Sequence, residues 1–404
     1  MIKKHNETID FIAEIYIYKG MEKIPKVILH FDVSRAVGRN MLKGIINYSR
    51  LHGSWKFYRT PPFYIENSAG AKTLAHLKEI EADGIITQGT SEVIALGLPA
   101  ICIDIRTKIP GLPIVTGDNS ASANMAAAHL IERGLRNFAF CGYNGIDWSD
   151  ERSENFTRFL TKEGFTVKQY QQSSSSRQRL WKNERDMLAQ WLKTLPKPIG
   201  IMACNDDRAA QVAEACRLAD IRVPDEIALI GVDNDELVCE LCDPPLSSVV
   251  FNFERAGFDA AALLDKMMHD KKNYPETITV KATHVATRHS TDILAIKDRQ
   301  VADAIRFIQN NARNMIQVDE VAFSVALTRR VLEKRFRNEL GRSVHEEIVR
   351  IRMELAARML LETNMSIANI ATVFGYSEIN NLARCFRKVK GMNPLTFRKQ
   401  FGMR

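Results

Sequence analysis

The sequence predicts a two-lobed α/β domain followed by an all-α domain with two helix-turn-helix units. Three observations support this prediction. Over roughly the first 290 residues, short apolar segments alternate with helical segments, which is typical of parallel sheets covered by helices on both faces. A helical pattern then occurs twice, about 50 residues apart, which indicates a duplicated unit. The net positive charge of the chain is confined to the region of this repeat.

The α/β prediction rests on seven short runs of apolar and β-branched residues, which we predict to be strands. These runs cover residues 27–31, 55–58, 84–87, 100–103, 138–141, 200–203 and 228–232. Apolar residues at helical spacing predict helices near residues 39–51, 119–133, 152–163, 183–195, 206–219 and 253–269. A chain of 404 residues is long enough for two or three domains, so a second domain fits after this one.

Polar residues directly follow several predicted strands, in the loops 32–35, 117–119, 205–207 and 231–234. Because ligands of parallel sheets bind at the carboxyl ends of the strands, these loops are expected to meet at one site. This set of polar residues suits a sugar, because carboxylates and amides can bridge neighbouring sugar hydroxyls and Arg donates hydrogen bonds in a fork. Trp148 is the expected aromatic cover for the C–H face of a sugar. Each Asp or Asn alone is better explained as a turn former or helix cap, and only their joint placement favours a site.

The charge is distributed unevenly along the chain. Residues 1–297 carry 37 Lys or Arg and 37 Asp or Glu, whereas residues 298–404 carry 19 and 11. The whole net charge of +8 therefore lies in the last quarter of the sequence. A small basic domain on a neutral body is typical of nucleic-acid-binding proteins. A solvated basic face is the alternative, and the charge alone does not decide between the two.

The internal repeat favours a nucleic-acid-binding domain over a solvated basic face. Leu332 and Phe336 recur as Leu382 and Phe386, and a glycine follows each pair at the same distance. Each unit is predicted to hold a short first helix and a longer second helix whose apolar pair faces inward. The expected caps are Asp319 and Thr328 in the first unit and Ser366 and Ser377 in the second. The first helices are expected to pack through Val321 and Phe323, or through Ile367, Ile370 and Ala371.

The outer faces of the two second helices carry the candidate DNA contacts. Arg can pair bidentately with guanine and Asn with adenine, and both can also hold phosphates. The candidates are Arg329, Arg330, Lys334 and Arg337 in the first unit and Asn380, Asn381, Arg384 and Arg387 in the second.

A strong helix is predicted between the two units. Ser343 and Glu346 form a capping box at its start, and an apolar stripe continues to about Glu362. Its length would be roughly 28 Å at 1.5 Å per residue, close to the approximately 34 Å of one B-DNA turn. The two recognition helices could therefore enter successive major grooves on one side of a duplex.

Residues 305–398 resemble the DNA-binding domain of the AraC family. The resemblance is carried by Thr328-Arg-Arg-Val-Leu-Glu-Lys-Arg-Phe336, Gly341-Arg-Ser343, Ile367-Ala-Asn-Ile-Ala371, Gly375-Tyr-Ser377 and Asn393-Pro394. It implies binding to double-stranded DNA, against the alternative of a plain helical bundle with a basic face. The second recognition helix reads Glu378-Ile-Asn-Asn381 and departs from the family pattern, so its base preference stays open.

Residues 25–291 resemble the ligand-binding domain of the LacI/GalR regulators and the periplasmic sugar-binding proteins. The resemblance is carried by segments 118–142, 205–206, 223–234 and 287–291. It implies a type I periplasmic-binding-protein-like fold with two Rossmann-like lobes. It also implies that Asp118, Arg152, Asn205 and Asp233 touch the ligand, in addition to the Trp148 inferred above.

The order of the two domains indicates a more specific group within these families. LacI-type regulators place their DNA-binding domain at the N-terminus, whereas this chain has its own at the C-terminus. The combination resembles a group of activators of xylose genes. It implies D-xylose as the effector, a homodimer on promoter DNA and RNA polymerase as a partner there. Sugar is expected to close the cleft and change how two chains pair, with the helix near 303–310 passing on the change.

The expected domain boundaries follow from these segments. We predict an N-terminal extension over residues 1–24, the sugar-binding domain over 25–291, a linker over 292–302 and the DNA-binding domain over 303–404. The helix-turn-helix units are expected at 319–337 and 367–388.

Several classes of function lack support in the sequence. It contains no P-loop, GxSxG, HExxH or dinucleotide motif, so neither an enzyme nor a cofactor is expected. Two alternatives to a sugar-responsive regulator remain. One is an enzyme with an appended DNA-binding domain, and the other is a constitutive DNA binder whose large domain only dimerises. Cys239 and Cys242 form a lone CxxC without a second ligand pair, so no metal is expected. The other cysteines lie mostly in apolar runs, and neither a signal peptide nor a long apolar span occurs, which predicts a cytoplasmic protein.

Overall fold

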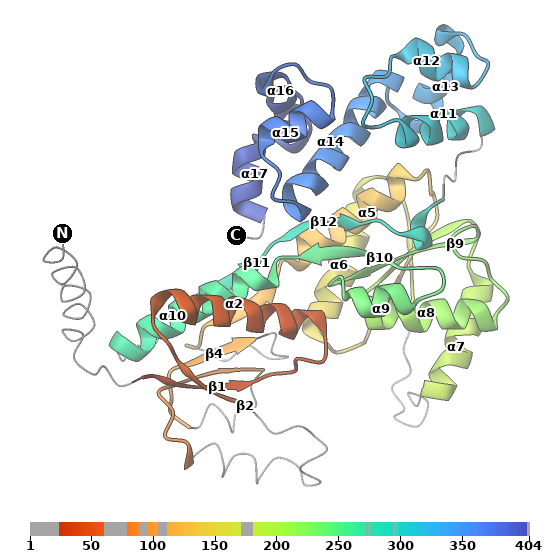
Figure 1. Ribbon diagram of the computed structural model, residues 1–404. Coiled ribbons are helices and arrows are strands. Elements are labelled where there is room, and N and C mark those ends of the chain that lie inside the picture. Colours follow the sequence, from red (N-terminus) through yellow and green to blue (C-terminus); the bar gives the residue numbers. More distant parts are fainter. Residues whose placement is uncertain are drawn as a thin grey trace, which may run out of the picture.

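The computed structural model describes residues 24–59, 79–88, 96–103, 111–170, 181–270, 274, 276–293, 296 and 298–401. The predicted N-terminal extension lies almost wholly outside these residues. The α/β domain and the helical domain are separate bodies, with the helical domain resting on one side of the α/β domain (Figure 1). We call the α/β part the sensor domain.

In the described part of the chain, the first lobe of the sensor domain is built on a parallel six-stranded sheet. Its strands, in spatial order, are β11 (Thr277–Val280), β5 (Ile114–Gly117), β4 (Ala100–Ile103), β3 (Gly84–Thr87), β1 (Lys26–His30) and β2 (Lys56–Arg59). Helices α2 (Ala36–His52) and α10 (Phe253–Asp270) pack closely together on this lobe. Their close approach requires glycine, because a Cβ at Gly44 would lie 1.9 Å from the Glu254 carbonyl oxygen.

The second lobe is built on another six-stranded sheet. Its strands, in spatial order, are β12 (Ala282–Ala286), β10 (Ser247–Phe251), β9 (Ile227–Val232), β8 (Ile199–Ala203), β6 (Phe138–Cys141) and β7 (Val167–Gln169). Every neighbouring pair is parallel except β10 with β12. Its helices are α5 (Asn119–Glu132), α6 (Asp147–Lys162), α7 (Trp181–Thr194), α8 (Asp206–Leu218) and α9 (Glu236–Leu241), and a short 3-10 helix, η1 (His289–Thr291), follows β12.

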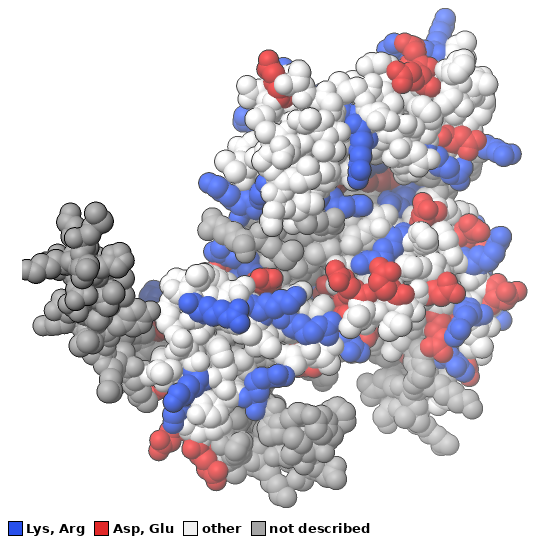
Figure 2. Space-filling view, viewed as in Figure 1, with Lys and Arg blue, Asp and Glu red and all other residues white. Residues whose placement is uncertain are grey.

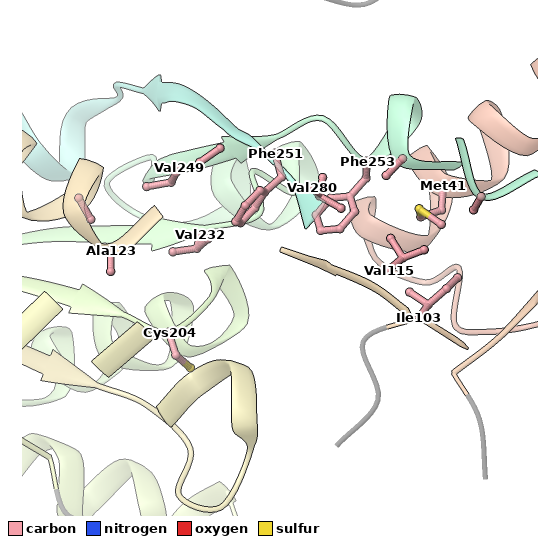
Figure 3. Packing of buried hydrophobic residues seen from close by; sticks show 14 of the residues in the cluster. Met41, Ile103, Val115, Ala123, Cys204, Val232, Val249, Phe251, Phe253 and Val280 are labelled. Atoms are coloured by element: carbon pink, nitrogen blue, oxygen red, sulfur yellow. The ribbon is translucent and has the colours of Figure 1, made fainter. Parts of the chain in front are cut away.

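Three crossovers connect the lobes, at Asp118 after β5, at Asn252 after β10 and at Lys281 between β11 and β12. One apolar cluster continues across them. Phe251 and Val280 lie between the buried side chains of the two lobes (Figure 3). The crossovers therefore form a packed hinge.

The two-lobed fold confirms the predicted architecture. The seven predicted strands are present, with bounds that agree to within one residue at each end. Strands β5, β7, β10, β11 and β12 and helix α9 were not predicted. Strands β7 and β11 read Val-Lys-Gln and Thr-Ile-Thr-Val, and as edge strands they lack the apolar run that marks a buried strand. Helix α6 begins five residues earlier than expected, at Asp147.

Over residues 298–401 the helical domain contains seven helices and two helix-turn-helix units. They are α11 (Arg299–Asn310), α12 (Val318–Ser324), α13 (Arg329–Leu340), α14 (Val344–Glu362), α15 (Ile367–Val373), α16 (Ile379–Lys390) and α17 (Pro394–Phe401). The capping box of Ser343 and Glu346 is present at the start of α14, as predicted. Gly341 and Gly391 end the recognition helices α13 and α16 at φ 71° and 75°, which explains why glycine recurs there.

Three local expectations are wrong. Helix α12 begins at Val318 with Gln317 as its N-cap, so Asp319 lies in the first turn. Glu378 rather than Ser377 is the N-cap residue of α16. Phe323 is 86% exposed, because the buried side of α12 is formed by Val318, Val321 and Ala322, and the next residue is turned by about 100° around the helix.

The start of the helical domain also differs in detail from the expected boundary. Helix α11 begins at Arg299, and the Asp298 side chain caps it by accepting from the Gln300 and Val301 backbone amides. The expected boundary at residue 303 therefore lies inside this helix. Four of the five buried residues of α11, namely Val301, Ala304, Ile305 and Ile308, belong to the core of the first helix-turn-helix unit.

Candidate effector cleft and DNA-binding helices

A cavity of about 310 Å³ lies between the two lobes. It is formed at the carboxyl ends of strands, where parallel sheets bind ligands. Four predicted residues line it, namely Trp148, Arg152, Asn205 and Asp233, whereas Asp118 does not. Its other polar lining residues are Asp32, Arg35, Gln88, Asp206, Asp207 and Asp235.

Arg152 is the centre of the predicted set and is only 4% exposed. Its guanidinium donates to Asn119 Oδ1 at 2.9 Å and to the Cys204 carbonyl at 2.5 Å. It also pairs with Asp233 Oδ1 at 3.3 Å and lies 5.2 Å from the centre of the Trp148 ring. An aromatic ring, a cation and a carboxylate therefore converge on one side of the cavity.

Asp233 lies in a strained loop at the end of β9. Asp233 and Asn234 have φ values of 98° and 50°, which side-chain-bearing residues seldom adopt. The loop is held by Asp206, which accepts from the Asp235 amide at 2.7 Å and from Ser248 Oγ at 2.6 Å. Burial raises the pKa of Asp206 well above its usual range, and the charge of Asp233 raises it further. Burial also raises the pKa of Asp233.

Ion pairs connect the lobes across the cleft. Arg35 Nε lies 2.9 Å from Asp207 Oδ2, and Arg39 Nη2 lies 3.0 Å from Asp235 Oδ1. The backbone amide of Ala36, at the start of α2, donates to Asp235 Oδ2 at 2.7 Å. These contacts bridge the two lobes at the cleft, and we call this arrangement closed. The sequence does not reveal these pairs, because about 170 to 200 residues separate the partners.

Two of the predicted residues have structural roles of their own. Asp118 Oδ1 accepts from the Ala121 amide at 2.9 Å and caps α5. Asn205 Oδ1 accepts from the Arg208 amide at 2.9 Å and caps α8. Asn205 also lines the cavity, so capping and ligand contact are compatible at that position.

The two recognition helices present matching outer faces. Leu332 and Phe336, like Leu382 and Phe386, are fully buried, which turns the opposite side of each helix to solvent. Seven of the eight candidate DNA contacts are exposed, and the eighth, Asn381, is half-buried. Arg330, Lys334 and Arg337 correspond to Asn380, Arg384 and Arg387 at a constant spacing of 50 residues. Arg329 pairs with Asp319 at 3.4 Å.

The helical domain contacts the second lobe and the hinge. Arg350 on α14 pairs with Glu132 on α5 at 2.7 Å, and Arg136 donates to the Glu339 carbonyl at 3.1 Å. At the hinge, Asn252 Nδ2 donates to the Phe401 carbonyl at 3.2 Å. Figure 2 shows Lys and Arg side chains gathered along the boundary between the two domains.

Comparison with known proteins agrees with this architecture. Residues 127–291 match a periplasmic binding protein-like domain, and residues 321–400 match a helix-turn-helix domain. The xylose operon regulatory protein of Haemophilus influenzae is 30% identical over 93% of this chain and 99% of its own length. The corresponding protein of Escherichia coli strain K12 is 30% identical over 92% of this chain and 96% of its own. A solved structure of a xylose-binding transcription activator, xylR, has a TM-score of 0.57 and 28% identity, covering 95% of this chain and 100% of that one.

A polar interlobe cleft combined with a double helix-turn-helix domain defines a sugar-sensing, AraC-type transcription regulator rather than an enzyme. The chain belongs to the family of the xylose operon regulatory proteins.

The remaining sequence features have simple structural explanations. All seven cysteines are free thiols, five of them buried, and Cys242 Sγ contacts the Val238 carbonyl at 3.2 Å. Within the described ranges, no group of three or more His, Cys, Asp or Glu side chains is placed to hold a metal ion. None of the helices in the described part of the chain is long and apolar enough to cross a membrane.

Proposed function

We propose that the chain is a cytoplasmic activator that binds D-xylose between its lobes and, as a homodimer, binds two half-sites on promoter DNA. RNA polymerase would be its partner at the promoter. The observation that carries the proposal is the convergence of Trp148, Arg152 and Asp233 in the interlobe cavity. The names of the two curated relatives and of the similar structure favour xylose among the sugars.

The chemistry of the cavity suits a small polyhydroxyl ligand. Its volume of about 310 Å³ lies at the lower end of the roughly 300–1,000 Å³ of typical ligand pockets, which favours a monosaccharide over a longer sugar. Asp233 can accept from a hydroxyl pair while Arg152 donates. The Trp148 ring offers an apolar face for the sugar C–H groups. Asn205 supplies a further amide, and Asp118 remains a candidate ligand if the lobes shift.

Sugar would act by favouring one arrangement of the lobes. A ligand shifts such an equilibrium only through its different affinity for the two states. Because Asn252 belongs to a crossover and contacts Phe401, a change of lobe angle would be transmitted to the DNA-binding domain. The pairing of two chains, and so the spacing of four helix-turn-helix units, would change with it.

Thermal melting of the full chain with a panel of pentoses and hexoses tests the proposal. Binding to the native state alone raises the midpoint by mass action, and a ligand at 100 times its Kd adds about 2.7 kcal/mol. We expect a shift with D-xylose that is absent in Asp233→Ala. Asp225→Ala, an exposed change on the same lobe, is the matched control and should retain the shift.

Other outcomes would distinguish a regulator with a different effector from a constitutive DNA binder. A shift with a different sugar or a sugar derivative alone would retain the regulator and contradict xylose. Equal DNA affinity with and without every sugar would favour a constitutive DNA binder whose large domain only dimerises.

A further inference from the structure

The two helix-turn-helix units have separate apolar cores. The first core is formed by α11, α12, α13 and the start of α14. The second is formed by the rest of α14 with α15, α16 and α17. Only α14 belongs to both. The relative orientation of the two recognition helices therefore depends on α14 and on whatever joins the units beside it.

Arg352 lies on α14 at the junction of the two units and is only 3% exposed. Its guanidinium donates to the carbonyls of Ala312 and Asn314, which precede α12 in the first unit. It also donates to the carbonyl of Phe374, in the turn of the second unit. Among the described residues no carboxylate pairs with Arg352. One buried cation therefore holds main-chain carbonyls from both units.

The acceptors are chemically suited to a cation. Phe374 is the C-cap residue of α15, and Ala312 directly follows Asn311, the C-cap residue of α11. Carbonyls at helix C-termini are left without intrahelical partners and carry partial negative charge. Arg presents a planar fork of five donors, whereas Lys has one compact ammonium group. A fork can serve two separate groups of carbonyls at once.

The two units also touch directly beside Arg352. Gly375 has φ 71°, and a Cβ there would lie 2.9 Å from Met315 Cγ of the first unit. The Arg352 guanidinium lies 5.6 Å and 5.4 Å from the ring centres of Phe374 and Tyr376. The turn of the second unit is therefore held against the loop between α11 and α12 of the first.

We propose that Arg352 is the positioning residue that sets the distance and angle between the two recognition helices, and thereby the spacing of DNA subsites that one chain reads. Arg352 is buried and does not touch DNA itself. The inference rests on the proposed DNA-binding function and deepens it, because it assigns subsite spacing to a residue outside both recognition helices.

The test uses the full-length chain and a duplex selected by the wild type from a random-sequence library. Two further duplexes have one or the other subsite scrambled, and a fourth has one base pair inserted between the subsites. For Arg352→Met we expect at least a tenfold loss of affinity on the intact duplex and less than a twofold change on each single-subsite duplex. The preference for the selected spacing over the inserted one should shrink at least fivefold. Compared with Arg352→Met, Arg352→Lys should restore part of the affinity for the intact duplex and part of the spacing preference.

Each other outcome is informative. Unchanged affinity and spacing preference in a folded Arg352→Met variant would overturn the inference. Equal losses on all duplexes, or a lost thermal transition in Arg352→Met and Arg352→Lys alike, would assign Arg352 a purely structural role and also overturn it. Arg358→Met, on the same helix, controls for loss of an α14 cation and should keep the wild-type spacing preference. A wild type that selects no sequence would contradict the proposed function itself, and the inference with it.

Discussion

The sensor domain and the DNA-binding domain are each built from two similar halves, and the halves are joined in opposite ways. Three crossovers connect the two lobes, and one apolar cluster continues through them. A single helix connects the two helix-turn-helix units, and each unit has its own cluster. The contacts between the lobes at the cleft include ion pairs at the cavity rim. The polar contact between the units is the buried Arg352.

The difference matches what each domain has to do. Partly exposed ion pairs contribute little net free energy, typically up to about 1 kcal/mol each. The Arg35–Asp207 pair, whose side chains are 50% and 36% exposed, can therefore exchange for ligand contacts at small cost. A buried guanidinium cannot leave its carbonyls without leaving them unsatisfied. The lobes are thus suited to move and the DNA-binding units to keep their relative position.

The largest expected effect is a loss of sugar affinity in the sensor domain that leaves DNA affinity unchanged. Arg152→Lys removes the fork that joins Asn119, Cys204 and Asp233. Charge-assisted hydrogen bonds contribute about 1.5–3 kcal/mol each, so the Kd for D-xylose in calorimetry should rise about 100-fold. Affinity for DNA without sugar should stay within twofold of wild type. A variant that binds xylose normally would contradict the placement of the ligand beside Arg152.

The next effect compares the two recognition helices. Lys334 and Arg384 occupy equivalent positions, 50 residues apart. Arg384→Ala should weaken binding to the selected duplex by about 1–3 kcal/mol if Arg384 contacts a base. Lys334→Ala should instead reduce the slope of log affinity against log salt by about one, as expected for a phosphate contact. Anisotropy titrations at several salt concentrations measure both, and identical behaviour of the two variants would contradict this division.

A smaller effect concerns the ion pairs of the cleft. Arg39→Gln removes the pair with Asp235 and should lower the population of the closed lobes without sugar. Apparent affinity falls in proportion to the competent fraction, so the Kd for xylose should rise about three- to tenfold. Arg50→Gln, an exposed change on the same helix, is the control. Tighter sugar binding by Arg39→Gln would mean that the pair competes with the ligand.

The smallest effect depends on pH. Burial lowers the pKa of the His129 imidazole well below its usual range, and the charge of Arg133 lowers it further. Between pH 7.5 and 5.5 the unfolded chain therefore takes up a proton that the folded chain does not. The free energy of unfolding should fall by about 1 kcal/mol from this residue. Denaturant titrations should show a smaller fall in His129→Gln, whereas His345→Gln, at an exposed position, should behave as wild type.

The parts of the structure that could be predicted share a physical cause. Continuous apolar runs marked β1, β3, β4, β6, β8 and β9, and repeated Leu, Phe and Gly positions marked the two helix-turn-helix units, because burial and left-handed caps restrict which residues fit. The interior strands β5 and β10 read Ile-Val-Thr-Gly and Ser-Ser-Val-Val-Phe, and their apolar runs are too short to mark a strand. The edge strand β11 was not predicted because its exposed residues Thr277 and Thr279 interrupt the apolar run. Phe323 was misplaced because a large apolar residue on a short helix does not by itself show which side is buried.

The sequence alone determined the two domain types, their order, the basic C-terminal region and most of the polar residues at the cleft, since these depend on local patterns and on residue type. Only the tertiary structure decided which residues meet over long separations. It paired Arg35 with Asp207 and Arg39 with Asp235, and it placed Asp206 behind the Asp233 loop. It also brought the ends of α11 and α15 together at Arg352. Such contacts depend on how separately formed elements pack, and no local pattern in the chain records them.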